Sequence, residues 1–86
     1  MLRIETENDG PRMVLRLIGR INANCIEELQ ERVENRACAM ILDLAEVHLV
    51  DLRSVRFLRD CQDQNIELRN CPSYILEWIR RERVEG

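Results

Sequence analysis

Residues 39–58, AMILDLAEVHLVDLRSVRFL, decide the fold, because they lead from a buried strand through a short loop into a helix. Residues 40–44 are almost entirely apolar, as is typical of a strand that is covered on both faces. Asp51 can accept hydrogen bonds from the free N–H groups of a first helical turn, so we expect it to cap the helix that follows. The apolar side of that helix is formed by Leu52, Val55, Phe57, Leu58 and Cys61.

The chain before this stretch begins with a predicted β-hairpin. Leu2, Ile4 and Thr6 alternate with charged residues, which is the period of a strand with one solvated face. Residues 8–11, Asn-Asp-Gly-Pro, have the backbone preferences of a tight turn. Residues 13–18 are nearly all apolar and predict a more buried second strand, which we expect Gly19 to end.

A first helix is predicted after this hairpin. Asn22 or Asn24 can cap it, and Glu27 is placed to close a capping box with Asn24. Its core-facing side is formed by Ile26, Leu29 and Val33. Because one strand precedes this helix and another follows it at short spacing, we expect the two strands to be parallel, with a right-handed crossover.

The end of the chain supplies a last strand and a last helix. Ile66 and Leu68 alternate with polar residues as an outer strand, and Pro72 is expected at the first position of a helix. The apolar residues of that helix are Ile75, Leu76, Trp78 and Ile79. The sequence thus predicts a single α/β domain over residues 1–86. We expect a small mixed sheet of about four strands flanked by helices, in the order β-β-α-β-α-β-α.

This order and several short motifs resemble the STAS family, the sulphate-transporter and anti-sigma-factor-antagonist domains. In that family an apolar strand, Asp-Leu and a loop lead to Asp-Ser-Ser-Gly at the start of a helix, an outline that residues 39–58 follow. Three further matches are Gly19-Arg20-Ile21-Asn22 for the family's Gly-x-Leu-Asp, Glu28-Leu29 for its Glu-Leu, and Asn70-Cys71-Pro72-Ser73 for its Asn-Pro-Ser. The resemblance implies a STAS fold for nearly the whole chain.

The chain departs from the family at the residues that carry its switch. STAS antagonists dock on a kinase-type anti-sigma factor, and a phosphoserine at the start of the second helix abolishes docking. Leu52 and Arg53 stand here at the serine positions and have no hydroxyl group, while Ser54 stands at the glycine. We expect the Ser54 hydroxyl to bond to the backbone or to water. The resemblance therefore implies an interaction module of the antagonist kind that phosphorylation at the family position does not switch.

The same helix start is the predicted partner-binding site. An apolar residue beside arginines is a combination that carries much of the binding energy of protein interfaces, although a solvated helix face with Leu52 folded inward is the other interpretation. With the residues that the resemblance adds, the predicted site comprises Asn22, Asp51, Leu52, Arg53, Ser54 and Arg56. We expect a protein partner, which the resemblance implies to be a kinase-type anti-sigma factor. A small-ligand or lipid-sensing module on the same fold is the alternative.

Composition argues against several other classes of function. The 13 basic and 16 acidic residues give a net charge of −3 without a basic stripe, so we expect no nucleic-acid binding. The absence of a leader-like or membrane-spanning apolar run favours a cytoplasmic protein without a membrane partner. Cysteines at positions 25, 38, 61 and 71 lack metal-binding spacing and are expected to be buried, reduced thiols.

Catalytic and metal-binding roles find little support. His48 is expected in the loop before the second helix, but no second histidine accompanies it. Asp43 is placed inside a strand, and Asp51 already serves as a cap. Cys71 would gain a lowered thiol pKa from the dipole of the last helix, but no neighbouring cysteine or histidine supports a thiol enzyme. We therefore expect no enzymatic activity, no cofactor and no metal.

Overall fold

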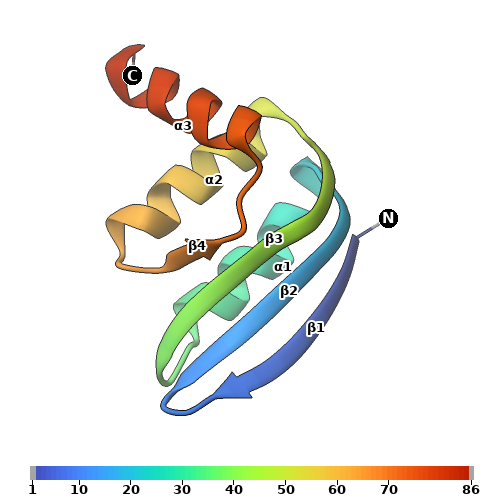
Figure 1. Ribbon diagram of the computed structural model, residues 1–86, viewed down its shortest axis with the longest axis vertical. Helices are drawn as coiled ribbons and strands as arrows, with labels where there is room; N and C mark the ends of the chain where they lie inside the picture. Colours follow the sequence, from blue (N-terminus) through green and yellow to red (C-terminus); the bar gives the residue numbers. More distant parts are fainter. Residues whose placement is uncertain (1, 86) are drawn as a thin grey trace.

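The computed structural model describes residues 2–85, with the backbone alone for Glu85. Its elements are β1 (Leu2–Asp9), β2 (Arg12–Ile21), α1 (Ala23–Glu34), β3 (Ala39–Val50), α2 (Leu52–Asp63), β4 (Glu67–Arg69) and α3 (Ser73–Glu85) (Figure 1). This is the predicted order β-β-α-β-α-β-α, and the strands form one mixed, four-stranded sheet. The predicted fold class is confirmed.

The sheet has the strand order β1-β2-β3-β4. β1 and β2 pair antiparallel, whereas β3 runs parallel to both β2 and β4. The crossovers through α1 and α2 place these helices next to each other on one face of the sheet, and α3 packs against α2 (Figure 1). The predicted parallel pairing of the strands around the first helix is confirmed.

One apolar core lies between this face of the sheet and the helices. Its fully buried members include Leu15, Leu17, Leu42 and Leu44 from the sheet, Ile26 and Leu29 from α1, Val55 and Leu58 from α2, and Ile75 from α3. The apolar runs of the strands and the helical periodicity predicted most of these positions. Leu76 is an exception, because it lies on the exposed side of α3.

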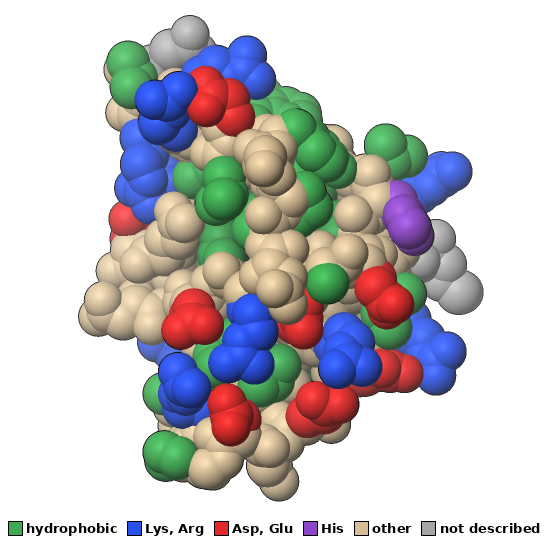
Figure 2. Space-filling view, viewed as in Figure 1, with side chains coloured by type: hydrophobic (Ala, Val, Ile, Leu, Met, Phe, Trp, Pro, Cys, Tyr) green, Lys and Arg blue, Asp and Glu red, His purple; other side chains and the backbone are tan. Residues whose placement is uncertain are grey.

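The lower part of the opposite face, in the view of Figure 1, is not covered by a helix. Val14 and Ile41 are buried there all the same, at 3% and 0% exposure, and they lie beside each other in the register of β2 and β3. Figure 2 shows charged side chains of both signs spread over the hydrophobic surface of this face. Glu7 is the register partner of Val14 and Glu67 is that of Ile41, and these charged neighbours take the place of a helix as the cover of the two side chains.

A closed ring of four ion pairs forms part of this cover. Arg12 contacts Asp9 at 3.3 Å and Glu67 at 3.6 Å. Arg69 contacts the same two carboxylates, at 3.5 Å and 3.7 Å. The ring ties the β1–β2 hairpin to β4 across β3, and we name it the four-residue ion ring.

β3 is longer than predicted, because residues 45–50 continue the strand instead of forming a loop. Residues 46–50 pair in parallel with residues 18–21 of β2, after a shift of register. His48 is therefore an exposed strand residue, and its predicted place in a loop was wrong. The shift breaks the alternation of apolar residues, so periodicity alone did not reveal the second half of the strand.

β2 also runs on past its predicted end, through Gly19 to Ile21. The register between β2 and β3 shifts on either side of Gly19, whose φ of 111° lies in the region that favours glycine. The glycine thus permits an irregularity within the strand and does not end it.

Two helix starts differ in detail from the prediction. Asn22, one of the two candidates, caps α1, so Glu27 does not close a capping box with Asn24. Pro72 lies one position before the first residue of α3, and its carbonyl oxygen accepts hydrogen bonds from the N–H groups of residues 75 and 76. Proline fits there because it has no N–H group of its own to satisfy.

Candidate functional site

The starts of α1 and α2 lie together at one end of the sheet. Ile21 and Val50, the last residues of β2 and β3, are register partners in the parallel pair. The next residue in each case, Asn22 and Asp51, caps the helix that follows. Because β2 and β3 are parallel, their carboxyl ends lie at the same end of the sheet. Two capping residues that were predicted separately from the sequence therefore lie close together.

Asp51 bonds to both helices. Its Oδ1 atom accepts hydrogen bonds from the backbone N–H of Ser54 at 2.8 Å and from the Ser54 hydroxyl at 2.7 Å, which confirms its predicted role as the cap of α2. Its Oδ2 atom accepts from the backbone N–H of Ala23 at 3.1 Å, in the first turn of α1. One carboxylate thereby fixes the two helix starts relative to each other.

The same contacts change the acidity of Asp51. The hydroxyl of Ser54 is the main group that lowers the pKa of Asp51 below its ordinary value, and the backbone N–H groups of Ser54 and Ala23 act in the same direction. Burial of the carboxyl group has the opposite effect on this pKa but does not outweigh the hydrogen bonds. The side chain is therefore a carboxylate at neutral pH, the form that a cap requires.

Ser54 is fully buried. Its hydroxyl oxygen lies 2.9 Å from the carbonyl oxygen of Ile21 and 2.7 Å from Oδ1 of Asp51, and it donates its one hydrogen towards these acceptors. The expectation that this hydroxyl bonds to the backbone is confirmed. A buried side chain cannot touch a docked partner, so Ser54 can contribute to the predicted site only by holding Asp51 and the end of β2 in place.

Asn22 is half-buried and is also used within the chain. Its Oδ1 atom accepts a hydrogen bond from the backbone N–H of Asn24 at 3.0 Å and lies 3.6 Å from the sulfur of Cys25. Its side chain is therefore committed to the start of α1, and its exposed part borders the predicted site.

Leu52 and Arg53 form the exposed part of the predicted site. Leu52 has 41% of its surface exposed, so it is not folded inward, and Arg53 is exposed on the next position of α2. Among the described residues, Arg53 has no hydrogen-bond or ion-pair partner for its guanidinium group. These two side chains are free to meet another molecule.

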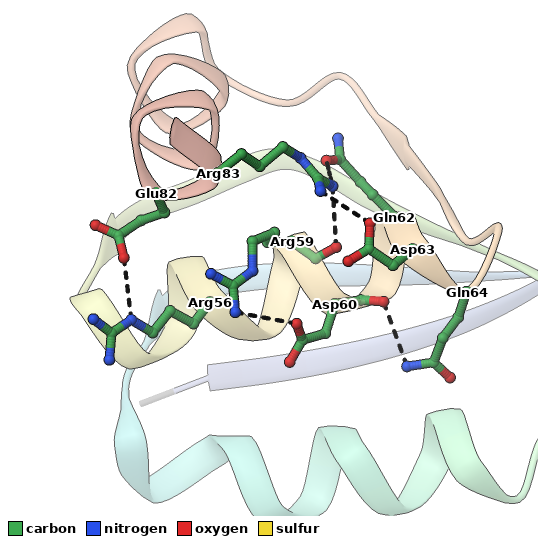
Figure 3. A network of polar contacts seen from close by, with 8 residues as sticks. All are labelled: Arg56, Arg59, Asp60, Gln62, Asp63, Gln64, Glu82 and Arg83. Atoms are coloured by element: carbon green, nitrogen blue, oxygen red, sulfur yellow. Dashed lines mark hydrogen bonds and ion pairs between the residues drawn. The ribbon is translucent and has the colours of Figure 1, made fainter. Parts of the chain in front are cut away.

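Arg56, in contrast, is held by α3. Its Nε atom donates to the carboxylate of Glu82 at 3.1 Å, and Arg83 on the next position of α3 binds Asp63 and the side chain of Gln62, each at 2.9 Å (Figure 3). These contacts join α2 to α3 along their exposed sides. Arg56 is thus part of the packing between two helices, which the sequence did not indicate.

Two exposed apolar side chains near this site were missed in the sequence. Leu49, near the end of β3, is 54% exposed, and Tyr74, near the start of α3, is 49% exposed. The Tyr74 hydroxyl donates to the backbone oxygen of His48 at 3.0 Å, which places Tyr74 against the last part of β3. We define the helix-start patch as Leu49, Leu52 and Arg53. Recognising Leu49 required knowing that β3 continues to Val50.

The cysteines differ from one another more than predicted. Cys61 is buried, and burial raises the pKa of its thiol to about 12. Burial also raises the pKa of Cys71 to about 11, which overturns the lowered value expected from the helix dipole. Cys25 is half-buried and Cys38 is exposed, so the expectation of four buried thiols was wrong for Cys38 in particular.

Metal-binding clusters and membrane-spanning helices are both absent from residues 2–85. No group of three or more His, Cys, Asp or Glu side chains in this part of the chain is arranged to hold a metal ion. None of the described helices reaches the length and hydropathy of a membrane span.

Known proteins resemble the chain in structure. No family model and no curated protein matches the sequence. An antisigma-factor antagonist STAS domain from Rhodobacter sphaeroides matches with a TM-score of 0.56 and 18% identity, over 85% of this chain and 91% of that one. An uncharacterised protein with a SpoIIAA-like fold from Shewanella loihica PV-4 matches with a TM-score of 0.53 and 13% identity, over 78% of this chain and 61% of that one.

A third match is to part of a much larger protein. The crystal structure of Mglu gives a TM-score of 0.63 and 22% identity over 80% of this chain, which spans only 19% of the length of Mglu. At these identities the likeness concerns the fold. The order of elements, the mixed sheet and these neighbours agree, and the chain has a STAS-like fold.

Proposed function

We propose that the chain is a regulatory protein-interaction module that docks through the helix-start patch on a partner of the kinase-type anti-sigma-factor class. In this proposal it acts by binding and not by catalysis, in the cytoplasm of a bacterium, in the control of transcription. Docking is not switched by serine phosphorylation at the start of α2. The STAS-like fold, shared with an antisigma-factor antagonist domain, supports the class of module.

One observation carries the proposal: the exposed residues at the start of α2 have no hydroxyl group, and Ser54, the serine in the first turn of that helix, is buried. Leu52 and Arg53 are exposed, whereas Ser54 is at 0% exposure with its hydroxyl between two oxygen acceptors. Phosphorylation of Ser54 would require this hydrogen bonding to be broken and a dianion to be placed beside the Asp51 carboxylate. The surface is therefore suited to constant docking.

The charge of the patch indicates the chemistry of the partner. The Asp51 carboxylate is bonded to the start of α2 and offsets the partial positive charge of this helix end, so the charge that the patch presents is that of Arg53, which has no internal ion pair among the described residues. Leu49 and Leu52, which precede Arg53 closely in the chain, supply exposed apolar surface. We expect the partner to present a carboxylate to Arg53 and apolar side chains to the two leucines.

The small-ligand alternative has no comparable observation in its favour. A hollow of about 530 Å³ lies between the α1–β3 connection and the end of α2, with Cys38 and Gln64 in its lining. It is wide open and lies at the opposite end of β3 from the helix-start patch. A ligand site is expected to be more enclosed and more apolar.

Binding tests the docking surface. Wild type, Arg53→Ala and the matched control Arg81→Ala, an exposed arginine of α3, are used as baits in extracts of the native cell, followed by affinity measurement with the purified kinase-like partner. We expect Arg53→Ala to weaken that affinity roughly tenfold or more, as for an interface hot spot, and Arg81→Ala to leave it unchanged. Equal affinities of the two variants would remove the helix-start patch from the proposal.

Intact-mass measurement tests the missing switch. After incubation with the partner kinase and ATP, we expect no phosphate on the wild type. The variant Leu52→Ser restores a hydroxyl at the family position and is expected to gain one phosphoryl group and to lose affinity for the partner. Phosphate on the wild type that peptide fragmentation locates at Ser54 would contradict the proposal, even if docking itself were observed.

A further inference from the structure

The outer edge of β1 is a second surface that is open to association, separate from the helix-start patch. β1 is eight residues long and stands at the end of the sheet, and within residues 2–85 only β2 pairs with it. Alternate residues of such an edge strand direct their N–H and C=O groups away from the sheet, where another strand can meet them. Backbone pairing at a free edge is a common mode of protein association.

The side chains of β1 divide between the two faces of the sheet. Leu2 and Ile4 are half-buried and pack at the margin of the core. Arg3 and Glu5 lie on the opposite face, where they contact each other at 3.0 Å. Arg3 is 74% exposed and has further N–H donors available, because one carboxylate cannot use all five.

We propose that β1 pairs antiparallel with β1 of a second copy of this chain, about a twofold axis at Ile4. Arg3 of each copy then lies opposite Glu5 of the other, Ile4 lies opposite Ile4, and Leu2 lies opposite Thr6. Two opposite-charge pairs form on one face of the joined sheet, and apolar side chains meet on the other. The product is a closed, symmetric dimer with a continuous eight-stranded sheet.

Charge selects this register against its neighbours. Residues directly opposite in an antiparallel pair must lie on the same face, so the axis must pass through a residue and not between two. An axis at Arg3 places two arginines opposite each other. An axis at Glu5 pairs Arg3 with Glu7 but places two glutamates opposite each other at its centre. An axis at Thr6 pairs Arg3 with Asp9 but places Glu5 opposite Glu7 on both sides, so only the axis at Ile4 forms opposite-charge pairs without a like-charge pair. Charges on an edge strand usually prevent pairing, but here they permit it in one arrangement.

A charge swap tests the register directly. Sedimentation velocity is measured from about 10 µM to about 1 mM protein at low salt, since five opposed residue positions per strand predict a weak dimer. We expect Arg3→Glu and Glu5→Arg each to weaken dimerisation roughly tenfold or more, because like charges then face each other. The double variant restores opposite charges, and we expect it to dimerise within about threefold of the wild type.

Arg81→Glu on α3 is the control and is expected to dimerise as the wild type does. Circular dichroism confirms that each variant is folded, a necessary check because Glu5 is half-buried and also contacts Arg16, its register partner in β2, at 3.7 Å. A wild type that stays monomeric at about 1 mM would overturn the proposal. So would single variants that associate normally, or a double variant as weak as the singles. None of these results depends on the partner proposed for the helix-start patch.

Discussion

The two faces of the sheet bury neighbouring residues of the same strand by different means. Leu42 of β3 points towards the helices and is 0% exposed, and Ile41, the residue before it, is also 0% exposed on the opposite face. Leu42 is enclosed by apolar side chains from the helices. Ile41 lies on the face that carries the four-residue ion ring, where charged side chains of both signs spread over the surface (Figure 2).

The exposed fraction of a residue alone therefore does not measure how much free energy its burial contributes to folding. Arginine and glutamate side chains can cover apolar surface with their methylene groups while their charged ends remain in water. These long side chains change conformation easily. Helices packed on a sheet, in contrast, form a close-packed interior that cannot rearrange freely to fill a cavity. We therefore expect two equally buried residues, one on each face, to contribute different amounts to the free energy of unfolding.

The largest effect is expected from Leu42→Ala. The substitution leaves a cavity in the close-packed core, and we expect it to lower the free energy of unfolding by about 3–4 kcal/mol in urea titrations. Ile41→Ala removes a similar apolar volume, but the arginine arms can close over the gap. We expect its cost to be roughly 1–2 kcal/mol smaller. Equal costs would mean that the charged cover is as rigid as the helical one.

Asp51→Ala should have the next largest effect, because it acts on the helical side at the joint between α1 and α2. It removes the cap of α2 and the bond to the Ala23 N–H, and it leaves the Ser54 hydroxyl with a single acceptor. We expect a loss of about 2 kcal/mol. Asn22→Ala, which removes the cap of α1 alone, is the comparison and should cost about 1 kcal/mol.

The contribution of Asp51 should also depend on pH in one direction. Its pKa is lowered in the folded chain from the ordinary 3.8, so its stabilisation is complete well above that value and is lost as the pH falls through the lowered pKa. The difference in unfolding free energy between wild type and Asp51→Ala should therefore shrink on acidification below 3.8. A constant difference down to the acid limit would contradict the hydrogen bonding described for this carboxylate.

Breaking the four-residue ion ring should have a smaller effect. Its members are about half exposed, so Arg69→Ala is expected to cost about 1 kcal/mol or less, partly through lost cover over Ile41. Because salt screens exposed charges, the cost should fall between 0.05 M and about 1 M NaCl, whereas that of Leu42→Ala should not. Arg81→Ala, at an exposed arginine outside the ring, provides the control for the loss of one positive charge.

The smallest effect on folding is expected from Arg53→Ala. The side chain is exposed and has no ion-pair or hydrogen-bond partner among the described residues, so the change in unfolding free energy should stay within about 0.5 kcal/mol. A stable Arg53→Ala protein with weakened partner binding would separate function from folding. A clear loss of stability would instead assign Arg53 a structural role.

Much of the fold could be predicted from the sequence because its signals are local. The alternation in β1, the apolar run at the start of β3 and the helical spacing in α1 each reflect which face of an element is buried. The cap at Asp51 could be predicted for the same reason, since a carboxylate bonds to the turn that directly follows it. The second half of β3 could not, because residues 46–50 are held by pairing with a distant strand after a shift of register.

Local signals in the sequence were enough to predict the order of the elements and the burial of the helical stripes, and they fix the absence of a hydroxyl group at Leu52 and Arg53. Three features could be seen only in the tertiary structure: Asp51 also binds α1, Ser54 is fully buried, and Arg56 forms an ion pair with Glu82. The reason is the range of the interactions. Periodicity and capping act within a few residues, whereas these contacts join positions 26 to 33 residues apart that only the packed sheet and helices bring together.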